Sequence, residues 1–404
     1  MHDQVAHGGS FMKTNNKMIK RLQNKSNNMK KFPYAFTSLL IASLIASPIN
    51  ANESSKHRSG KHSSKQMMNF GPGEHYQHDM DINISEFKKV KDISKKAFDL
   101  PDPLDRKQSK TVTVELEAVE VISKIAPNIL YHYWTFNETV PGPFLRVREG
   151  DTVELSLHND HKSSHSHAID LHAVTGPGGG KAVTEVEPGE TKTLKFKATT
   201  PGLYVYHCAA GNPATHIANG MYGMILVEPK QGMAEVDHEF YIMQGELYTK
   251  GRLGKKGFQK FNARKMIDER PEYIVFNGRT GALVGDGQLD AKVGDKIRLF
   301  IGNAGVAKIS SFHIIGEIFD RVYPEASLSS VNKNVQTTLV PAGGASMVEF
   351  KVDYPGNYVL VDHALARIDR GAWGILNVSG AKNDSLYSGS ANKAHSDKKQ
   401  HEGH

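Results

Sequence analysis

The chain has 404 residues, a formal net charge of +7 and one cysteine. Seven of its basic residues and a single acid fall in residues 1–51, so the remainder is close to neutral and offers no clustered basic face for nucleic acid. A lone cysteine excludes an internal disulfide framework, and the length suits two domains of ordinary size once the ends are set aside.

The N-terminal region has the pattern of a secretory signal peptide. Lys30 and Lys31 precede an apolar run of 11 residues over 36–46, and the small residue Ala51 closes the segment that follows. Because the run is too short for a spanning helix, residues 1–51 are predicted to be an upstream extension and a signal peptide. We therefore expect export to the periplasm and a mature chain that begins near Asn52, without a transmembrane anchor.

The rest of the chain is predicted to be a β-rich region between two polar ends. Residues 52–105 and 381–404 are rich in Ser, Lys and His and are predicted to be flexible, His-containing segments. Between them, short runs of alternating apolar residues, such as 111–116, 152–157 and 193–198, are separated by Pro-Gly and Gly-Asp turns. This pattern predicts an all-β fold of Greek-key sandwiches.

An internal repeat divides the β-rich region into two copies. Four motifs of the first half recur in order in the second, at offsets that grow from 140 to 154. They are Phe136-Asn137 with Phe276-Asn277, Gly150-Asp151 with Gly294-Asp295, His167 with His313, and Pro201-Gly202 with Pro355-Gly356. The repeat predicts one sandwich domain over 106–232 and a second over 233–380.

The strongest functional signal surrounds Cys208. His216 and Met221 follow it on one loop, eight and thirteen residues on. A thiolate, an imidazole and a thioether suit copper, and a blue-copper centre completes this donor set with a second imidazole.

A neighbouring segment can supply that imidazole and hold a second metal. His167 and His172 lie five residues apart on a strand-like segment, so their side chains are expected on opposite faces. His207 and Cys208 are adjacent and should also face opposite ways. The sequence therefore predicts two metal centres joined by one peptide bond.

The second copy of the repeat has lost the thiolate. Asp362 stands opposite Cys208, whereas His313 and His363 remain at corresponding places. We predict that these two histidines serve a site of another kind. The polar loop that holds His158, His161 and His165 is predicted to be solvated.

These motifs together resemble those of the copper-containing nitrite reductases, over roughly residues 105–380. The resemblance implies two tandem cupredoxin-like Greek-key β-sandwich domains and two coppers per chain. The type 1 copper ligands it implies are His167, Cys208, His216 and Met221. The type 2 ligands it implies are His172, His207 and His363, with Asp170 and His313 as catalytic residues. The loop between Cys208 and His216 resembles that of the shorter-loop branch, which includes neisserial outer-membrane enzymes.

The resemblance also implies a reaction and its partners. Nitrite would be reduced by one electron to nitric oxide and water at the type 2 copper, in denitrification or nitrate assimilation. The electron would come from a small cytochrome or cupredoxin through the type 1 copper and the His207–Cys208 link. His363 would reach the site from a neighbouring subunit of a homotrimer.

Two alternatives remain at this point. A multicopper oxidase would need repeated His-x-His pairs and a His-Cys-His core, whereas Ala209 follows Cys208 here. A non-catalytic periplasmic copper or electron carrier would hold one copper and would need neither His172 nor Asp170. Copper stoichiometry distinguishes the carrier, and the products formed from nitrite and dioxygen distinguish the two enzymes.

Overall fold

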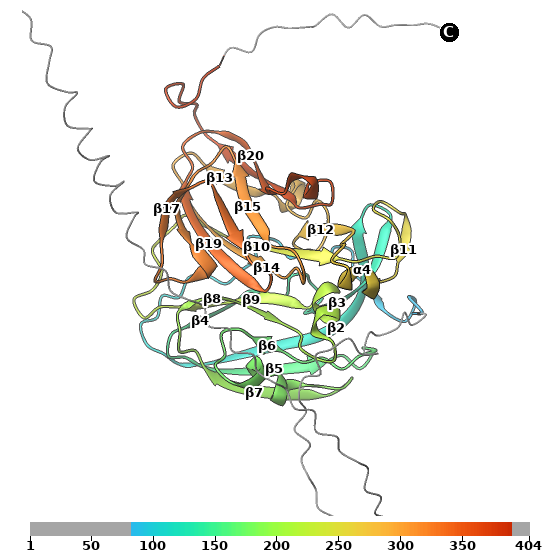
Figure 1. Cartoon of the computed structure of the whole chain (residues 1–404). Coiled ribbons are helices and arrows are strands. Elements are labelled where there is room, and N and C mark those ends of the chain that lie inside the picture. Colours follow the sequence, from blue (N-terminus) through green and yellow to red (C-terminus); the bar gives the residue numbers. More distant parts are fainter. Residues whose placement is uncertain (1–81, 390–404) are drawn as a thin grey trace, which may run out of the picture. The chain divides into compact units, whose positions relative to one another are not determined.

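The structure is a computed structural model that describes residues 82–389, and these form two β-sandwiches in succession along the chain (Figure 1). The predicted all-β fold of two tandem sandwiches is therefore confirmed. The predicted signal peptide and residues 390–404 of the predicted C-terminal tail lie outside the described residues.

The first sandwich consists of a six-stranded and a four-stranded sheet. The larger sheet has the order β11-β3-β2-β5-β7, with β1 paired to β2. Its strands are β1 (Lys88–Lys89), β2 (Thr111–Ala126), β3 (Ile129–Phe136), β5 (Thr152–Asn159), β7 (Thr191–Lys197) and β11 (Gly257–Gln259). The smaller sheet, in the order β4-β9-β8-β6, consists of β4 (Leu145–Arg148), β6 (Asp170–Leu171), β8 (Gly202–His207) and β9 (Tyr222–Glu228).

The second sandwich consists of a six-stranded and a five-stranded sheet. The first of these has the order β12-β10-β14-β19-β16-β17 and the second β13-β21-β20-β15-β18. The six strands are β10 (His238–Leu247), β12 (Tyr273–Phe276), β14 (Lys296–Asn303), β16 (Phe319–Tyr323), β17 (Asn332–Val335) and β19 (Gly344–Lys351). The five are β13 (Leu289–Lys292), β15 (Ser310–Ile315), β18 (Thr337–Val340), β20 (Gly356–Asp362) and β21 (Trp373–Ser379).

The described helices are short and connect strands. The α-helices are α2 (Lys181–Thr184), α3 (Pro213–Ala218) and α4 (Ala263–Ile267). The 3-10 turns are η1 (Pro177–Gly180), η2 (Gly285–Gly287), η3 (Pro324–Ala326) and η4 (Leu365–Arg367). Two of these elements, η1 and α3, lie beside the candidate site described below.

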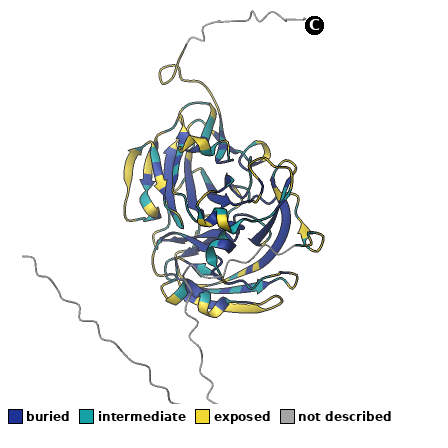
Figure 2. Ribbon diagram, turned by 45° about the vertical axis from the view of Figure 1, so that its right-hand side comes forward, coloured by how far each residue is buried: buried dark blue, intermediate teal, exposed yellow. Residues whose placement is uncertain are grey.

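The strands follow from the alternation of apolar and polar residues. In β5, the buried positions Val153, Leu155 and Leu157 alternate with residues that are more exposed. Side chains of a strand point alternately to its two faces, so this pattern buries one face and leaves the other near solvent. Figure 2 shows the result across both sandwiches, with buried residues on the inner faces and exposed residues on the outer strands.

The three largest apolar clusters hold the described part of the chain together. One fills the first sandwich and includes Cys208 and Met221, and another fills the second sandwich. The third contains residues of both sandwiches, such as Val205 and Phe300, and so joins them. Because β11 comes from the second half of the chain and pairs with β3, the first sheet also extends beyond the boundary predicted at residue 232.

Motifs that recur in the sequence adopt the same backbone conformation in both sandwiches. Asn137 and Asn277 are both left-handed, with φ of 57° and 45°. The Asn137 side chain accepts a backbone N–H from Glu117 at 2.8 Å. The Asn277 side chain accepts one from Met243 at 2.8 Å. Each asparagine thus joins the end of its strand to the neighbouring strand in the same way, which explains why the motif is repeated.

Part of the predicted N-terminal flexible segment is ordered. Residues 82–105 run along the sandwiches, and Ile93 and Ala97 are fully buried there. Asp92 forms an ion pair with Arg279 at 2.6 Å. The polar composition of this segment predicted flexibility because only a few of its residues make these contacts. Two buried apolar residues and one ion pair nevertheless hold it in place.

Within residues 82–389, no helix is long and apolar enough to cross a membrane.

Candidate metal centre

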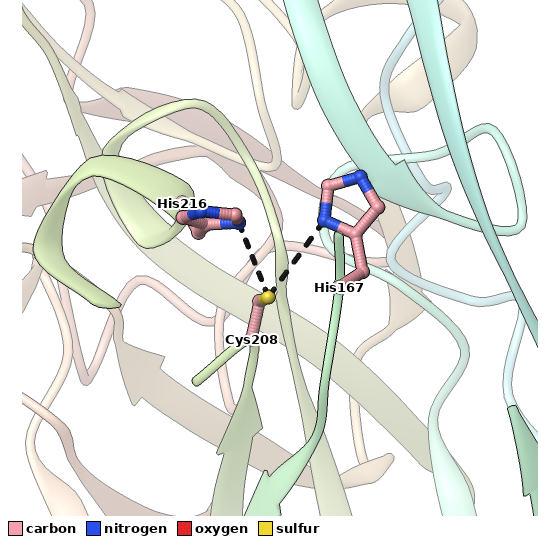
Figure 3. Close-up of side chains that lie close together, drawn as sticks. All are labelled: His167, Cys208 and His216. Carbon is pink, nitrogen blue, oxygen red and sulfur yellow. Dashed lines mark hydrogen bonds between the residues drawn. The ribbon is translucent and has the colours of Figure 1, made fainter. Parts of the chain in front are cut away.

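A thiol and two imidazoles converge inside the first sandwich. Cys208 directly follows β8, His216 lies in α3, and His167 forms an isolated β-bridge with Val186. The Cys208 Sγ atom lies 3.2 Å from Nδ1 of His216 and 3.8 Å from Nδ1 of His167 (Figure 3). These three residues form a group whose ligand atoms can share one metal ion.

Met221 is held beside this cluster by the backbone. The Cys208 N–H donates to the Met221 carbonyl at 3.0 Å, and the Met221 N–H donates to the His216 carbonyl at 3.2 Å. The Met221 side chain is fully buried in the same apolar cluster as Cys208. Of the four residues predicted to bind type 1 copper, the structure therefore brings His167, Cys208 and His216 together and holds the backbone of Met221 beside them.

Burial determines the charge state of this cluster. It raises the pKa of the Cys208 thiol to about 11. It also lowers the pKa of His167 and holds that of His216 well below the usual value. Without a cation the three groups are therefore neutral at pH 7, and a thiolate requires a positive charge beside it.

The residues of this cluster fit copper. Soft sulfur and borderline imidazole donors are the set that stabilises both Cu(I) and Cu(II). The inward-facing Nδ1 atoms of both histidines point at the thiol, as ligands to one ion would. Nε2 of His167, on the opposite edge of the ring, is buried without a hydrogen-bond partner at normal distance among the described residues.

A second cluster lies on the other side of the β8 end. Nε2 of His172 and Nε2 of His207 lie 3.1 Å apart, and Asp170 completes a group whose ligand atoms lie within 4.8 Å of one another. His207 Nδ1 lies 3.0 Å from the Cys208 carbonyl, and the Gly343 backbone hydrogen-bonds to the His172 ring. These backbone contacts leave both Nε2 atoms free to bind a metal.

A glycine-rich turn lies against Asp170. Gly179 in η1 has φ of +55°, and a Cβ at this position would lie 1.8 Å from Oδ1 of Asp170. Only a residue without a side chain allows such an approach. By contrast, a Cβ at Gly176 would have nothing within 4 Å.

The second sandwich contributes a pair of histidines. His313 in β15 and His363 directly after β20 have ring centroids 5.4 Å apart. His313 Nδ1 lies 2.6 Å from the Gln336 carbonyl, which leaves its Nε2 as the free ring nitrogen. His363 is exposed, and its N–H donates to the Ser311 carbonyl at 2.7 Å.

The residue opposite Cys208 in the second copy has become a structural carboxylate. Asp362 is fully buried and forms an ion pair with Arg367. It also accepts backbone N–H groups from Ser311 at 3.2 Å and Ala364 at 3.1 Å. These contacts fix the backbone on both sides of His363.

The strand register corrects one pairing inferred from the repeat. Asp170 pairs with His207 between β6 and β8, and His313 pairs with Val361 between β15 and β20. Both β8 and β20 begin at the repeated Pro-Gly motif, so Val361 takes the place of His207. His313 therefore takes the place of Asp170 and not that of His167. The error arose because the loops before the two strands differ in length.

One group beside the first cluster was missed in the sequence. His165 is not solvated as predicted: its Nδ1 lies 2.9 Å from Oε1 of Glu120, and its ring packs at a tilt against Trp134 with centroids 4.2 Å apart. Burial favours the neutral form of Glu120, but the three surrounding imidazoles of His132, His165 and His167 outweigh it and hold the pKa of this carboxyl below its usual range. The only signal of this group in the sequence was Glu120 itself, a charged residue among apolar neighbours in β2.

Comparisons with known proteins agree with this architecture. A family model described as multicopper oxidase matches residues 122–232. The copper-containing nitrite reductase of Neisseria meningitidis serogroup A is 52% identical over 295 residues, which are 73% of this chain and 76% of that protein. The enzyme of the same name from Neorhizobium galegae is 34% identical over 299 residues, 69% of this chain and 75% of that one. A solved copper nitrite reductase from Nitrosomonas europaea has 34% identity and a TM-score of 0.60, covering 68% of this chain and 95% of its own.

Two tandem cupredoxin-like sandwiches with a buried His-Cys-His cluster define a two-domain copper protein. The chain belongs to the copper-containing nitrite reductases, as its identity to relatives over more than two thirds of its length shows. It is a copper-dependent oxidoreductase that reduces nitrite with electrons from a donor. Nitrite reduction therefore takes precedence over the multicopper oxidase and carrier alternatives.

The first prediction concerns the thiol. Replacing Cys208 with Ala should abolish the intense visible band of thiolate-to-copper charge transfer, because this is the only sulfur that can give a thiolate. Copper at the second cluster should remain, since no sulfur lies in it. Visible absorption and copper content of the purified variant provide the test. A band that survives the substitution would exclude Cys208 as a ligand.

Proposed function

We propose that each chain holds two coppers, one on either side of the His207–Cys208 peptide bond. The type 1 copper would be bound by His167, Cys208, His216 and Met221. The type 2 copper would be bound by His172, His207 and His363. The observation that carries this proposal is the convergence of a buried thiol set and a surface imidazole set on adjacent residues of one strand end.

Copper at the two clusters would supply one-electron transfer and, at the imidazole set, an open coordination position for nitrite. Conversion of nitrite to nitric oxide and water takes up one electron and two protons. Because His207 and Cys208 are neighbours in the chain, the path between the two clusters is covalent. Nitric oxide formation by the copper-loaded protein with an artificial reductant, together with two coppers per chain, tests the proposal.

Asp170 and His313 are proposed to supply the two protons that nitrite reduction takes up. Asp170 lies beside the two first-domain imidazoles, with its carboxylate within 4.8 Å of their ring nitrogens, so it can serve as an acid or base for a ligand bound there. His313 occupies the same place in the second sandwich, and its Nδ1 faces the Gln336 carbonyl. A proton on Nε2 of His313 could therefore be given to a substrate oxygen while the ring stays oriented.

We further propose a homotrimer in which His363 completes the type 2 site of a neighbouring subunit. Among the described residues, the group of Asp170, His172 and His207 does not include His363, although that histidine is exposed. Around it are exposed apolar side chains that suit a contact between subunits. They are Ile309, Leu339 and Leu365, with 54%, 64% and 47% of their surface exposed.

The cellular setting is proposed from the sequence. The pattern of residues 30–51 supports export to the periplasm through a signal peptide. There the electron donor would be a small cytochrome or cupredoxin, and the enzyme would serve denitrification or nitrate assimilation. Cell fractionation of the native host, with the mature N-terminus sequenced, tests this assignment.

The second prediction concerns His363. Replacing it with Ala should lower copper occupancy at the imidazole set while leaving the visible thiolate band unchanged, because the two sets share no ligand. Copper content, absorption and sedimentation of the same sample provide the measurement. A monomer that keeps two coppers and full activity would rule out a site shared between subunits.

The third prediction concerns Asp170. Replacing it with Asn keeps the size of the side chain but removes the carboxylate, so copper loading should persist. Loss of a positioned acid or base costs about 10²–10⁴-fold in rate, and we expect the steady-state rate of nitrite reduction to fall within that range. Near wild-type turnover in the fully loaded variant would remove Asp170 from the mechanism.

The fourth prediction concerns the glycine turn. Ala at Gly179 must displace Asp170, because its Cβ would fall 1.8 Å from Oδ1. A displacement of about 1 Å in a catalytic group can cost about 10²-fold, so turnover should drop while copper content stays constant. Gly176→Ala is the matched control, since a Cβ there meets no atom within 4 Å. Equal activities of the two variants would contradict the proposed role of the turn.

A further inference from the structure

A buried carboxylate in β2 lies behind the first metal cluster. Glu120 is surrounded by three imidazoles, and its side chain has no exposed surface. Its carboxylate oxygens lie 3.2 Å from Nε2 of His132, 2.9 Å from Nδ1 of His165 and 3.6 Å from Nε2 of His167. Ser164 donates to it twice, through its N–H at 2.9 Å and its hydroxyl at 2.6 Å.

His167 connects this carboxylate to the metal cluster. One edge of its ring, Nδ1, faces the Cys208 thiol, and the opposite edge, Nε2, faces Glu120. A neutral imidazole that binds a metal through Nδ1 carries its proton on Nε2. That N–H is fully buried, so it needs an acceptor to avoid the cost of an unsatisfied polar group. The Oε1 atom of Glu120 lies 3.6 Å from Nε2, just beyond a normal hydrogen bond, and is the acceptor that we assign to this N–H.

The carboxylate also reaches the second imidazole of the cluster indirectly. His165, held by Glu120, packs at a tilt against Trp134, with 4.2 Å between ring centroids. Trp134 in turn lies edge-on to His216 at 4.7 Å. The Glu120 carboxylate thus lies next to His167, and the Trp134 ring connects it to His216.

We propose that Glu120 is a positioning residue that accepts the outer N–H of His167, fixes the orientation of this ring, and lowers the reduction potential of copper bound to it. A carboxylate partner makes a metal-bound imidazole a stronger donor, and a nearby negative charge favours Cu(II) over Cu(I). This inference rests on the proposed binding of type 1 copper by His167, Cys208 and His216.

The test compares two buried carboxylates. Glu120→Gln removes the charge behind His167 but keeps the size of the side chain. The control is Glu246→Gln, because Glu246 is equally buried but hydrogen-bonds to Tyr248 and to the Lys308 N–H. The midpoint potential is measured by redox titration of the visible band in the copper-loaded enzyme, and the retention of Cu(II) is measured against a competing chelator.

We expect Glu120→Gln to keep the visible band, to raise the midpoint potential and to weaken Cu(II) binding about 10–100-fold, the usual effect of losing an outer partner of a metal-bound histidine. Glu246→Gln should change neither quantity. A midpoint potential equal to the wild-type value in Glu120→Gln, or an equal shift in both variants, would overturn the inference.

A second variant keeps the test decisive if Glu120→Gln does not fold. Ser164 is exposed, and Ser164→Ala removes one donor to the carboxylate without touching the metal cluster. The carboxylate should then accept more strongly from His167, so the midpoint potential should fall below the wild-type value. A rise or no change would contradict the role of Glu120. Absence of the visible band from the wild-type enzyme would instead contradict the copper assignment itself.

Discussion

The alternation of side chains at the end of β8 is the constraint on which both clusters depend. Cys208 is fully buried in the first sandwich, whereas His207, one residue earlier, faces the second cluster. A slip of one residue in the pairing of β8 would exchange these faces and destroy both sites together. The register is fixed by six consecutive pairs with β9, from Gly202 with Val227 to His207 with Tyr222.

Burial then gives the two clusters different chemistry. In the inner cluster, the raised pKa of the Cys208 thiol and the lowered pKa values of His167 and His216 leave three neutral ligands in an apolar core. Such a set can be folded without a buried charge and can then exchange its thiol proton for a cation. The outer cluster is partly exposed, so a small anion can reach it. In the proposed function, electron storage and substrate binding are thus separated by solvent access.

The sequence was sufficient to predict the clusters because their ligands come from neighbouring strand ends. Cys208, His216 and Met221 lie on one loop, and strand periodicity places His167 and His172 on opposite sides. The surroundings of Glu120 could not be predicted in this way. Its partners come from β3 and from the loop after β5, and only the pairing of these strands with β2 brings them together.

The two sandwiches show how one scaffold came to hold different groups at equivalent places. The position of the thiol is taken by Asp362, whose ion pair with Arg367 fixes the backbone around His363. The position of Asp170 is taken by His313, so the two proposed proton carriers stand at the same point of the same fold. A repeat that only lost its thiol would have left a cavity or an unpaired polar group in the core. Replacement of the thiol by the paired carboxylate of Asp362 avoids this cost. The second sandwich can then present His313 and His363 at its surface.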